Sequence, residues 1–158
     1  MKGLKSLIAK HYTKEEFAWI MQDWANSVYS LMITTAIFPL YFKTVSSNAG
    51  ISAADSTAFL GYANSIATFA VSIMAPVLGA LADYKGYRNP MFTWSTLLGV
   101  FSVIGMMFAE TDQWILLLAL YTLSAIGYSA SNIFYDSSIM DVTTYDRMDR
   151  ISAAGYGY

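Results

Sequence analysis

Two long apolar runs are joined by the stretch Gly79-Ala80-Leu81-Ala82-Asp83-Tyr84-Lys85-Gly86-Tyr87-Arg88. Neither the run before it, residues 58–78, nor the run after it, residues 91–109, contains an Asp, Glu, His, Lys or Arg. At a helical rise of about 1.5 Å per residue, each run is long enough to cross a hydrocarbon layer of roughly 30 Å. The joining stretch is therefore predicted to reverse the chain at a membrane surface, with Gly86 providing the backbone freedom that a tight turn needs.

The composition of the chain is that of an integral membrane protein. Of its 158 residues, 56% are hydrophobic and only 13% are charged, whereas about a quarter of the residues of a soluble domain are charged. The net charge of −2 gives no basis for a nucleic-acid partner. With no cysteine, one histidine and no carboxylate pair at membrane depth, we expect neither an enzyme, nor a metal site, nor a cofactor.

The apolar runs predict an all-α fold with four transmembrane helices. These spans cover about residues 24–42, 58–82, 91–109 and 114–134. Residues 43–56 are predicted to form the first loop, and residues 110–113 a very short connection between the third and fourth spans. Pro39 is expected to kink or end the first span near its outer end.

Two helix starts carry capping signals. Thr13 and Glu16 have the spacing of a capping box, in which each side chain bonds the backbone N–H of the other residue. The helix that begins there is predicted to continue into the first span. Ser52, followed by Asp55, has the pattern of the cap of the next helix.

The distribution of basic residues predicts the orientation of the chain. Eight of the nine Lys and Arg residues lie on segments of one side, and Lys43 alone lies on the other. By the positive-inside rule, that side is the cytoplasm, so residues 1–13 are expected to be a cytoplasmic tail and residues 136–150 a cytoplasmic loop. Residues 151–158 have the pattern of the start of a fifth helix. The eight residues are Lys2, Lys5, Lys10, Lys14, Lys85, Arg88, Arg147 and Arg150.

Small residues recur at helix-contact spacing in the second and fourth spans. Such pairs let helix backbones approach closely, so packing is the expected use, and sliding during gating stays open as an alternative. The pairs are Gly61 with Ser65, Ala75 with Gly79, Ala125 with Ser129, and Gly127 with Ser131.

Several motifs resemble those of a known transporter family. The pattern G-x-L-A-D-x-x-G-x-R of residues 79–88 resembles the loop between helices two and three of the major facilitator superfamily. Asp23-Trp24-Ala25-Asn26-Ser27 resembles the opening of its vacuole-effluxer family, relatives of fungal autophagy-related amino-acid effluxers with many bacterial members. Gly61-Tyr62-Ala63-Asn64-Ser65 and Asp149-Arg150-Ile151-Ser152-Ala153-Ala154-Gly155-Tyr156 fit the same family, so that the resemblance extends over residues 15–158.

The resemblance implies a secondary-active transporter of twelve spans, built as two six-span halves. Residues 1–158 would be part of the N-terminal half, completed by the remaining helices, and the parent protein would export small solutes such as amino acids by alternating access. A bacterial cell membrane is the expected location, or a vacuolar membrane if the source is fungal. The alternative is a free-standing four-helix scaffold or oligomerising module without transport activity.

The resemblance also implies which residues line a substrate cavity. The first and fourth helices of each half face the cavity, so Asp23, Asn26 and Ser30 on the first span are candidates for contacts with substrate or a coupling proton. Asp23 could instead be a solvated anchor at the interface, favoured by the helix dipole. Tyr128 and Asn132 on the fourth span are candidates too, and packing explains them equally well.

Asn64 is expected to be buried in the second span, where its amide must find a hydrogen-bond partner. A structural bond between helices is the favoured interpretation of this residue, and contact with substrate is the alternative.

The loop residues are expected to form a latch. By resemblance, Asp83 and Arg88, together with Asp136 or Asp141 at the inner end of the fourth span, would form an ion-pair cluster in one transport state only. Gly79 and Gly86 complete the loop motif. The alternative is a positive-inside anchor with a surface ion pair worth ~0–1 kcal/mol.

The chain departs from one related pattern. Proton-coupled drug exporters of the superfamily carry an arginine in the fourth span, and this chain has none there. Coupling to protons within this half would therefore depend on Asp23.

Overall fold

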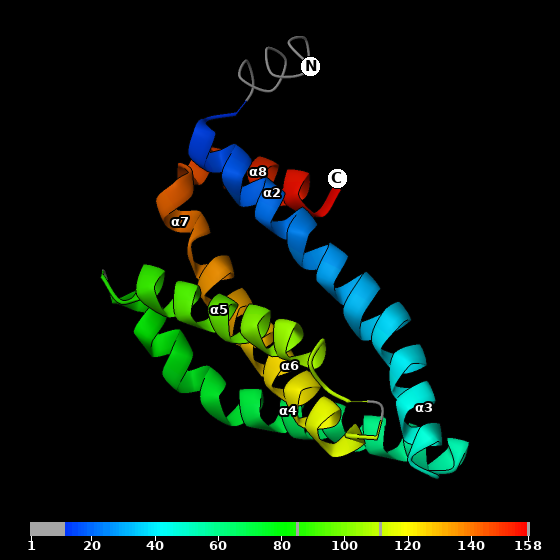
Figure 1. Ribbon diagram of the computed structural model, residues 1–158. Helices are drawn as coiled ribbons and strands as arrows, with labels where there is room; N and C mark the ends of the chain where they lie inside the picture. Colours follow the sequence, from blue (N-terminus) through cyan, green and yellow to red (C-terminus); the bar gives the residue numbers. More distant parts are fainter. Residues whose placement is uncertain (1–11, 85, 111, 158) are drawn as a thin grey trace. The chain divides into compact units, whose positions relative to one another are not determined.

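All regular structure in the described part of the chain is helical. The computed structural model describes residues 12–84, 86–110 and 112–157. Most of the predicted tail of residues 1–13 lies outside the described residues. Lys85, a basic residue of the predicted turn, lies outside them as well. In chain order the elements are α2 (Lys14–Tyr29), the π-helix η1 (Ser30–Ile37), α3 (Phe38–Asn48), α4 (Ala53–Asp83), α5 (Arg88–Met106), α6 (Trp114–Ser137), α7 (Ile139–Val142) and α8 (Tyr145–Gly157) (Figure 1).

Among the described residues, three helices are long and apolar enough to cross a membrane: Lys14–Asn48, Ala53–Asp83 and Trp114–Ser137. They contain the predicted spans 24–42, 58–82 and 114–134. The predicted span 91–109 corresponds to α5, which is not among the three. Helix α5 begins with the polar residues Arg88 and Asn89 and ends at Met106 rather than at residue 109, so its apolar part is shorter than expected.

The first helix is longer than its apolar run. It begins at the predicted capping box, in which Glu16 N–H donates to Thr13 Oγ1 at 3.2 Å and Thr13 N–H donates to Glu16 Oε2 at 2.8 Å. Pro39 does not end the helix. It stands in the first turn of α3, directly after η1, so the helix continues past it. The prediction that residues 43–56 form a loop is wrong, since α3 runs to Asn48.

Helix α4 starts where the sequence predicted. Ser52 is its N-cap, and the Ser52 Oγ accepts the backbone N–H of Asp55 at 3.1 Å. Gly50, with a φ of +79°, makes the turn between α3 and α4 possible.

The chain divides into two compact units, which are described separately. Unit 1 comprises Met1–Leu31 and Ser138–Tyr158, and unit 2 comprises Met32–Ser137. In unit 1, α8 packs along α2 (Figure 1). The contact is close, because a Cβ atom on Gly155 would stand 2.9 Å from the ring of Trp19.

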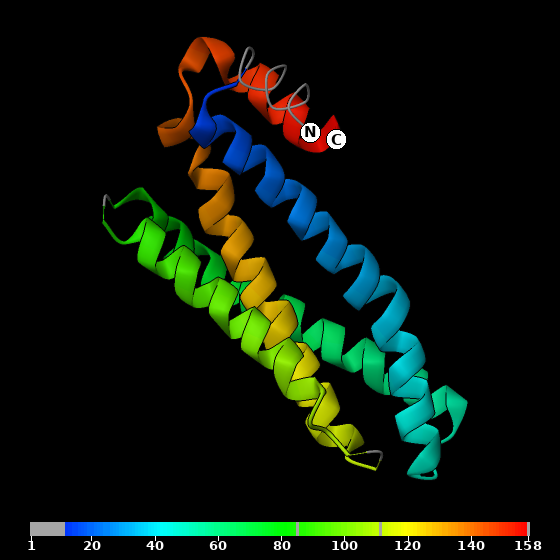
Figure 2. The same ribbon diagram turned by 45° about the horizontal axis from the view of Figure 1, so that its top comes forward.

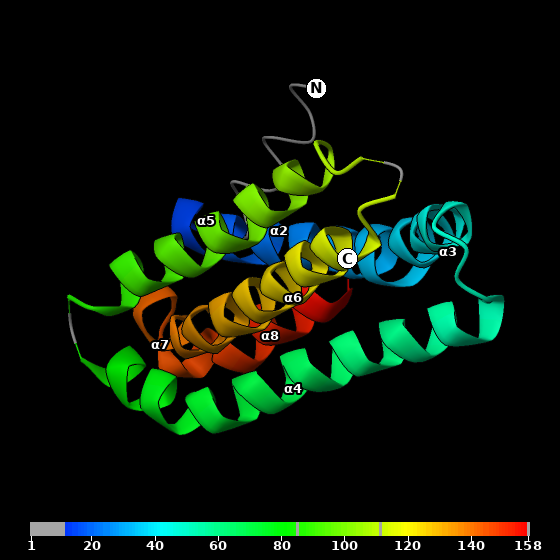
Figure 3. The same ribbon diagram turned by 60° about the horizontal axis from the view of Figure 1, so that its bottom comes forward.

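In unit 2, helix α6 lies between α4 and α5 (Figure 3) and runs beside α5 along most of its length (Figure 2). Gly127 of α6 is where the two backbones come closest. A Cβ atom there would stand 2.7 Å from the backbone nitrogen of Gly99 and 2.8 Å from the carbonyl oxygen of Ser95. The packing use expected of Gly127 and Ser131 is confirmed, since both are buried. At Gly61 and Gly79 a Cβ atom would meet nothing within 4 Å.

The segment predicted as a loop at residues 136–150 is largely helical. Helix α6 continues to Ser137, α7 follows, and α8 begins at Tyr145 instead of residue 151. The prediction of a loop was made because this segment is polar and charged. Charged residues argue against a membrane span, but they do not argue against a helix outside the membrane. Its cytoplasmic location stays a prediction.

Candidate functional site

The turn of residues 79–88 separates α4 from α5 as predicted. Helix α4 ends at Asp83, Gly86 has a φ of +103°, and α5 begins at Arg88. Arg88 Nε donates to the carbonyl oxygen of Ala82 at 2.9 Å. Arg88 therefore caps the C-terminal end of α4, where a cation is favourable against the helix dipole.

The acidic residues predicted for the latch are distributed over both units. Asp83 and Asp136 are exposed and belong to unit 2, at the ends of α4 and α6, respectively. Asp141 is exposed on α7 and belongs to unit 1. The ion-pair latch therefore stays a prediction.

Three cavity candidates lie along the first helix in unit 1. Asp23 and Asn26 are half-buried, and the Asn26 Oδ1 accepts a hydrogen bond of 3.4 Å from Gln22 Nε2. Ser30 is exposed at the point where α2 changes into η1. Because a π-helix has more residues per turn than an α-helix, the polar face formed by these three residues does not continue into η1 at α-helical spacing.

Asn64 makes the predicted bond between helices. The hydroxyl of Tyr121 on α6 donates to Asn64 Oδ1 at 2.9 Å, and Asn64 Nδ2 donates to the carbonyl oxygen of Leu60 at 3.1 Å. Asn64 is exposed in the described chain, so the expectation that it is buried is wrong. Helix α6 is the main neighbour of α4, and much of the rest of α4 is left uncovered. The other two candidates of unit 2, Tyr128 and Asn132, are half-buried on α6.

Tyr121 is a central residue of unit 2 that the sequence did not single out as a site. Its side chain is fully buried, and its ring stacks on Phe38 with a centroid distance of 3.9 Å and an interplanar angle of 9°. Thr34 is a further hydrogen-bond partner of its hydroxyl. Tyr121 thus joins the first helix and α4 to α6 by one ring contact and two hydrogen bonds.

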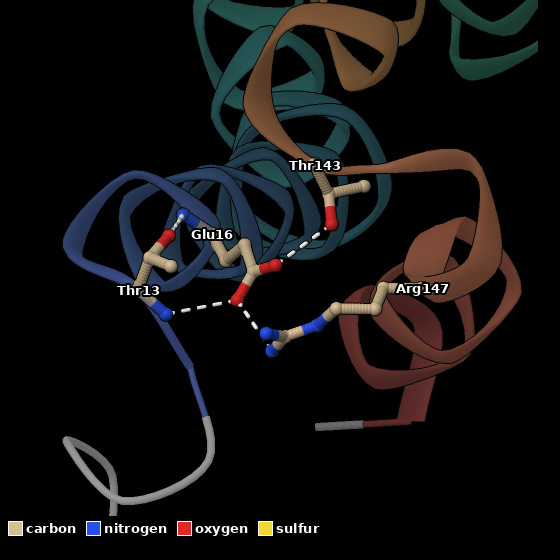
Figure 4. Close-up of polar contacts among 4 residues, drawn as sticks. All are labelled: Thr13, Glu16, Thr143 and Arg147. Carbon is tan, nitrogen blue, oxygen red and sulfur yellow. Dashed lines mark hydrogen bonds and ion pairs between the residues drawn. The ribbon is translucent and has the colours of Figure 1, made fainter.

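The most deeply buried charged side chain among the described residues is Glu16, on α2 of unit 1. It is 2% exposed, and its carboxylate accepts three hydrogen bonds (Figure 4). Thr13 N–H donates at 2.8 Å, Thr143 Oγ1 donates at 2.7 Å, and Arg147 Nη2 forms an ion pair at 2.9 Å. We refer to these four residues as the Glu16 cluster.

The Glu16 cluster could be predicted only in part. The capping box indicated the local bond between Thr13 and Glu16, because both residues lie in one helical turn. Thr143 and Arg147 are 127 and 131 residues away in the sequence, and no periodicity signals such a pairing. The one available signal was an acidic residue near the start of α2 and a basic residue in the polar segment after α6.

Two further interactions involve the start of α8 and the residues around it. The Arg150 guanidinium lies over the ring of Tyr12, 5.6 Å from its centroid. A hydrogen bond from Thr144 and the nearby charge of Arg147 hold the pKa of Asp146 below its ordinary value. Asp146 therefore stays charged to lower pH. Its negative charge is favourable in the first turn of α8, where the helix dipole is positive.

An open hollow of about 380 Å³ lies on α5 and α6, lined by Trp94, Leu97, Leu98, Phe101, Ser102 and Leu120. The lining is almost entirely apolar and includes none of the predicted cavity residues. Among the described residues, no group of three or more His, Cys, Asp or Glu side chains is placed to hold a metal ion.

Long apolar helices, a charged turn between two of them and hydrogen bonds between helices define a multi-pass membrane protein. The chain belongs to the family described as "Vacuole effluxer Atg22 like", whose match covers residues 50–147. This family consists of transporters and not of enzymes, as the sequence predicted.

The chain is 46% identical over 148 residues to an uncharacterized MFS-type transporter, YxiO, of Bacillus subtilis (strain 168). The alignment covers 94% of this chain and 35% of YxiO, so the chain spans about a third of the length of that relative. No solved structure matches the chain significantly.

Proposed function

We propose that the chain forms the opening helices of a major-facilitator transporter that exports small solutes, with amino acids as the expected class, by alternating access. The identity of 46% to an MFS-type transporter over nearly the whole chain carries this proposal. This identity to a transporter favours transport over a free-standing scaffold.

Within this proposal, the N-terminus is cytoplasmic and Asp23, Asn26 and Ser30 line the path of the substrate, together with Asn64, Tyr128 and Asn132. An acidic side chain at the edge of the membrane is costly, which supports a functional role for Asp23. The turn of residues 79–88 acts as a latch, because an ion pair made in only one state shifts the equilibrium between two states.

Counterflow tests the transport activity. Vesicles that contain the intact transporter are loaded with one unlabelled amino acid, and uptake of the same labelled amino acid is followed for a panel of L-amino acids. We expect transient accumulation above that of empty vesicles for at least one of them. Accumulation that never exceeds that of empty vesicles would reject amino acids as the substrate class.

The same vesicles test the two charged sites. Asp23→Asn should change the apparent affinity or the pH dependence of counterflow, and an unaltered profile would make Asp23 an interfacial anchor. Asp83→Asn should slow transport at unchanged expression, whereas an equal rate would remove the latch.

A further inference from the structure

The first helix, Lys14–Asn48, is held near both of its ends and is free of buried side chains in between. Near its start, Glu16, Trp19 and Ile20 are buried. Near its end, Phe38, Phe42 and Val45 are buried. None of residues 21–37 is buried in the described chain.

The unburied part contains η1, eight residues of π-helix. In a π-helix each carbonyl bonds the amide five residues later, so the segment holds more residues than an α-helix of the same number of turns. Pro39 contributes to this local structure, because it has no N–H to donate to the carbonyl of Thr35. Such insertions into α-helices are frequent at functional sites.

The position of η1 coincides with a division of the chain. The boundary between the units falls between Leu31 and Met32, inside η1. The chain passes from unit 2 back to unit 1 between Ser137 and Ser138, in the short connection between α6 and α7. Both links are therefore places where a regular α-helix is interrupted.

We infer that η1 is a register element, which can change from π-helical to α-helical hydrogen bonding and thereby turn α2 relative to α3. One extra residue absorbed into an α-helix corresponds to a rotation of about 100°. Asp23, Asn26 and Ser30 precede or begin η1 and would turn with α2, whereas Thr34 is held by Tyr121. This inference rests on the proposed function, since the rotation would change which polar groups line the substrate path.

Because of the Glu16 cluster, α2 would turn together with α7 and α8. Its bonds from Thr143 and Arg147 tie α2 to the α7 and α8 segment of the same unit. At the other side of η1, the Phe38 ring on Tyr121 holds α3 to α6. A helix that is fixed on both sides of one irregular segment can change its register only in that segment.

Two single-residue deletions test the register element in the intact transporter. Deleting Met32, an exposed residue of η1, removes the extra residue and should leave a regular α-helix whose two ends keep their positions. Deleting Ala18, an exposed residue of α2 between Glu16 and Trp19, is the matched control. It turns Glu16 by about 100° relative to Trp19 and Ile20, so that the bonds of the Glu16 cluster and the contact of Trp19 with Gly155 cannot both be kept.

Thermal unfolding in detergent and counterflow are measured on both variants. We expect the Met32 deletion to unfold near the temperature of the unmodified protein and to lose at least about tenfold in counterflow rate, because it fixes one register. The Ala18 deletion should unfold at a clearly lower temperature. Equal unfolding temperatures for the two deletions, or an unchanged counterflow rate after deletion of Met32, would overturn the inference.

Hydrogen exchange of the unmodified transporter provides a readout that needs no substrate. The amides of residues 30–37 should exchange at least about tenfold faster than those of residues 40–48, since they open more readily. Equal exchange rates would overturn the register element. A failure of all substrates in counterflow together with fast exchange at residues 30–37 would instead reject only the proposed function.

Discussion

Glu16 and Glu15 are neighbours in sequence but have opposite environments. Glu15 is exposed, whereas Glu16 is buried and accepts hydrogen bonds from Thr13, Thr143 and Arg147. A buried carboxylate is costly unless its charge and its oxygens are satisfied. The three donors meet that requirement, so Glu16 can stabilise unit 1.

Replacing the charge of Glu16 should destabilise the protein. In Glu16→Gln the ion pair to Arg147 is lost, and we expect a loss of about 1.5–3 kcal/mol, the usual value of a hydrogen bond to a charged group. Thermal or denaturant unfolding in detergent measures it. Glu15→Gln is the control and should be neutral, and equal stability of the two variants would contradict a structural role for the Glu16 cluster.

The hydroxyl of Tyr121 should matter more than those of exposed tyrosines. Tyr121→Phe keeps the ring on Phe38 but removes the hydroxyl's bonds to Asn64 and Thr34, and we expect a loss of about 0.5–1.5 kcal/mol per bond. Tyr62→Phe removes a hydroxyl from a side chain that is 63% exposed and serves as the control. If both variants unfold alike, the hydrogen bonds of the Tyr121 hydroxyl contribute nothing to stability.

Single residues were predictable where their partners are local. Thr13 and Ser52 were identified as caps because each bonds a residue three positions later. The partner of Asn64 was not identifiable, because the sequence gives no register between α4 and α6. The same reason hid Thr143 and Arg147 from the sequence-based prediction.

At the scale of helices, the close contact between α5 and α6 depends on one glycine, Gly127. Gly127 lets the backbone of α6 approach Gly99 and Ser95 more closely than any Cβ atom permits. Van der Waals packing drives helix association in a bilayer, so the loss of this approach should be felt directly.

Gly127→Ala should separate α5 from α6. The added Cβ atom would meet backbone atoms, which cannot rotate away, and we expect a loss of about 1–3 kcal/mol. Gly99→Ala is the matched control on the other helix, because its Cβ atom would meet nothing closer than 3.7 Å. Unfolding of both variants in the same detergent is compared, and a neutral Gly127→Ala would refute the close approach.

The centres of the helices were predictable and their limits were not. An uninterrupted apolar run indicates a span, and the runs at residues 58–82 and 114–134 lie within α4 and α6. Polar residues flank these runs, and hydropathy cannot distinguish a polar loop from a polar helical extension such as residues 43–48. The change to π-helical bonding in η1 leaves no trace in the apolar pattern.

At the scale of the whole molecule, the orientation in the membrane is open to a direct test. The chain has no cysteine, so single cysteines can report the side from which they are reached. Ser47→Cys, in the last turn of α3, and Tyr87→Cys, in the turn before α5, are both at exposed positions.

In a transporter free of other cysteines, a membrane-impermeant maleimide should label Ser47→Cys on intact cells. Tyr87→Cys should be labelled only after the cells are permeabilised, because its turn is expected in the cytoplasm. The reverse pattern would invert the predicted topology, and labelling of both positions on intact cells would contradict a span between them.

The predicted cavity residues show what a sequence can say about a site of this kind. Asp23, Asn26 and Ser30 belong to unit 1, whereas Asn64, Tyr128 and Asn132 belong to unit 2. The family resemblance indicated the helices that carry them. It could not indicate that the first helix changes its period between the two groups.

Helix α5 has a consequence for how the protein is made. It is not among the helices apolar enough to cross a bilayer by themselves, yet it fits closely against α6. Since α5 is synthesised first, we expect it to wait in the translocation channel until α6 emerges and to enter the lipid with it as a hairpin. Membrane insertion of α5 would then pause until α6 is made. The close approach of the two helices at Gly127 would help α5 to leave the channel.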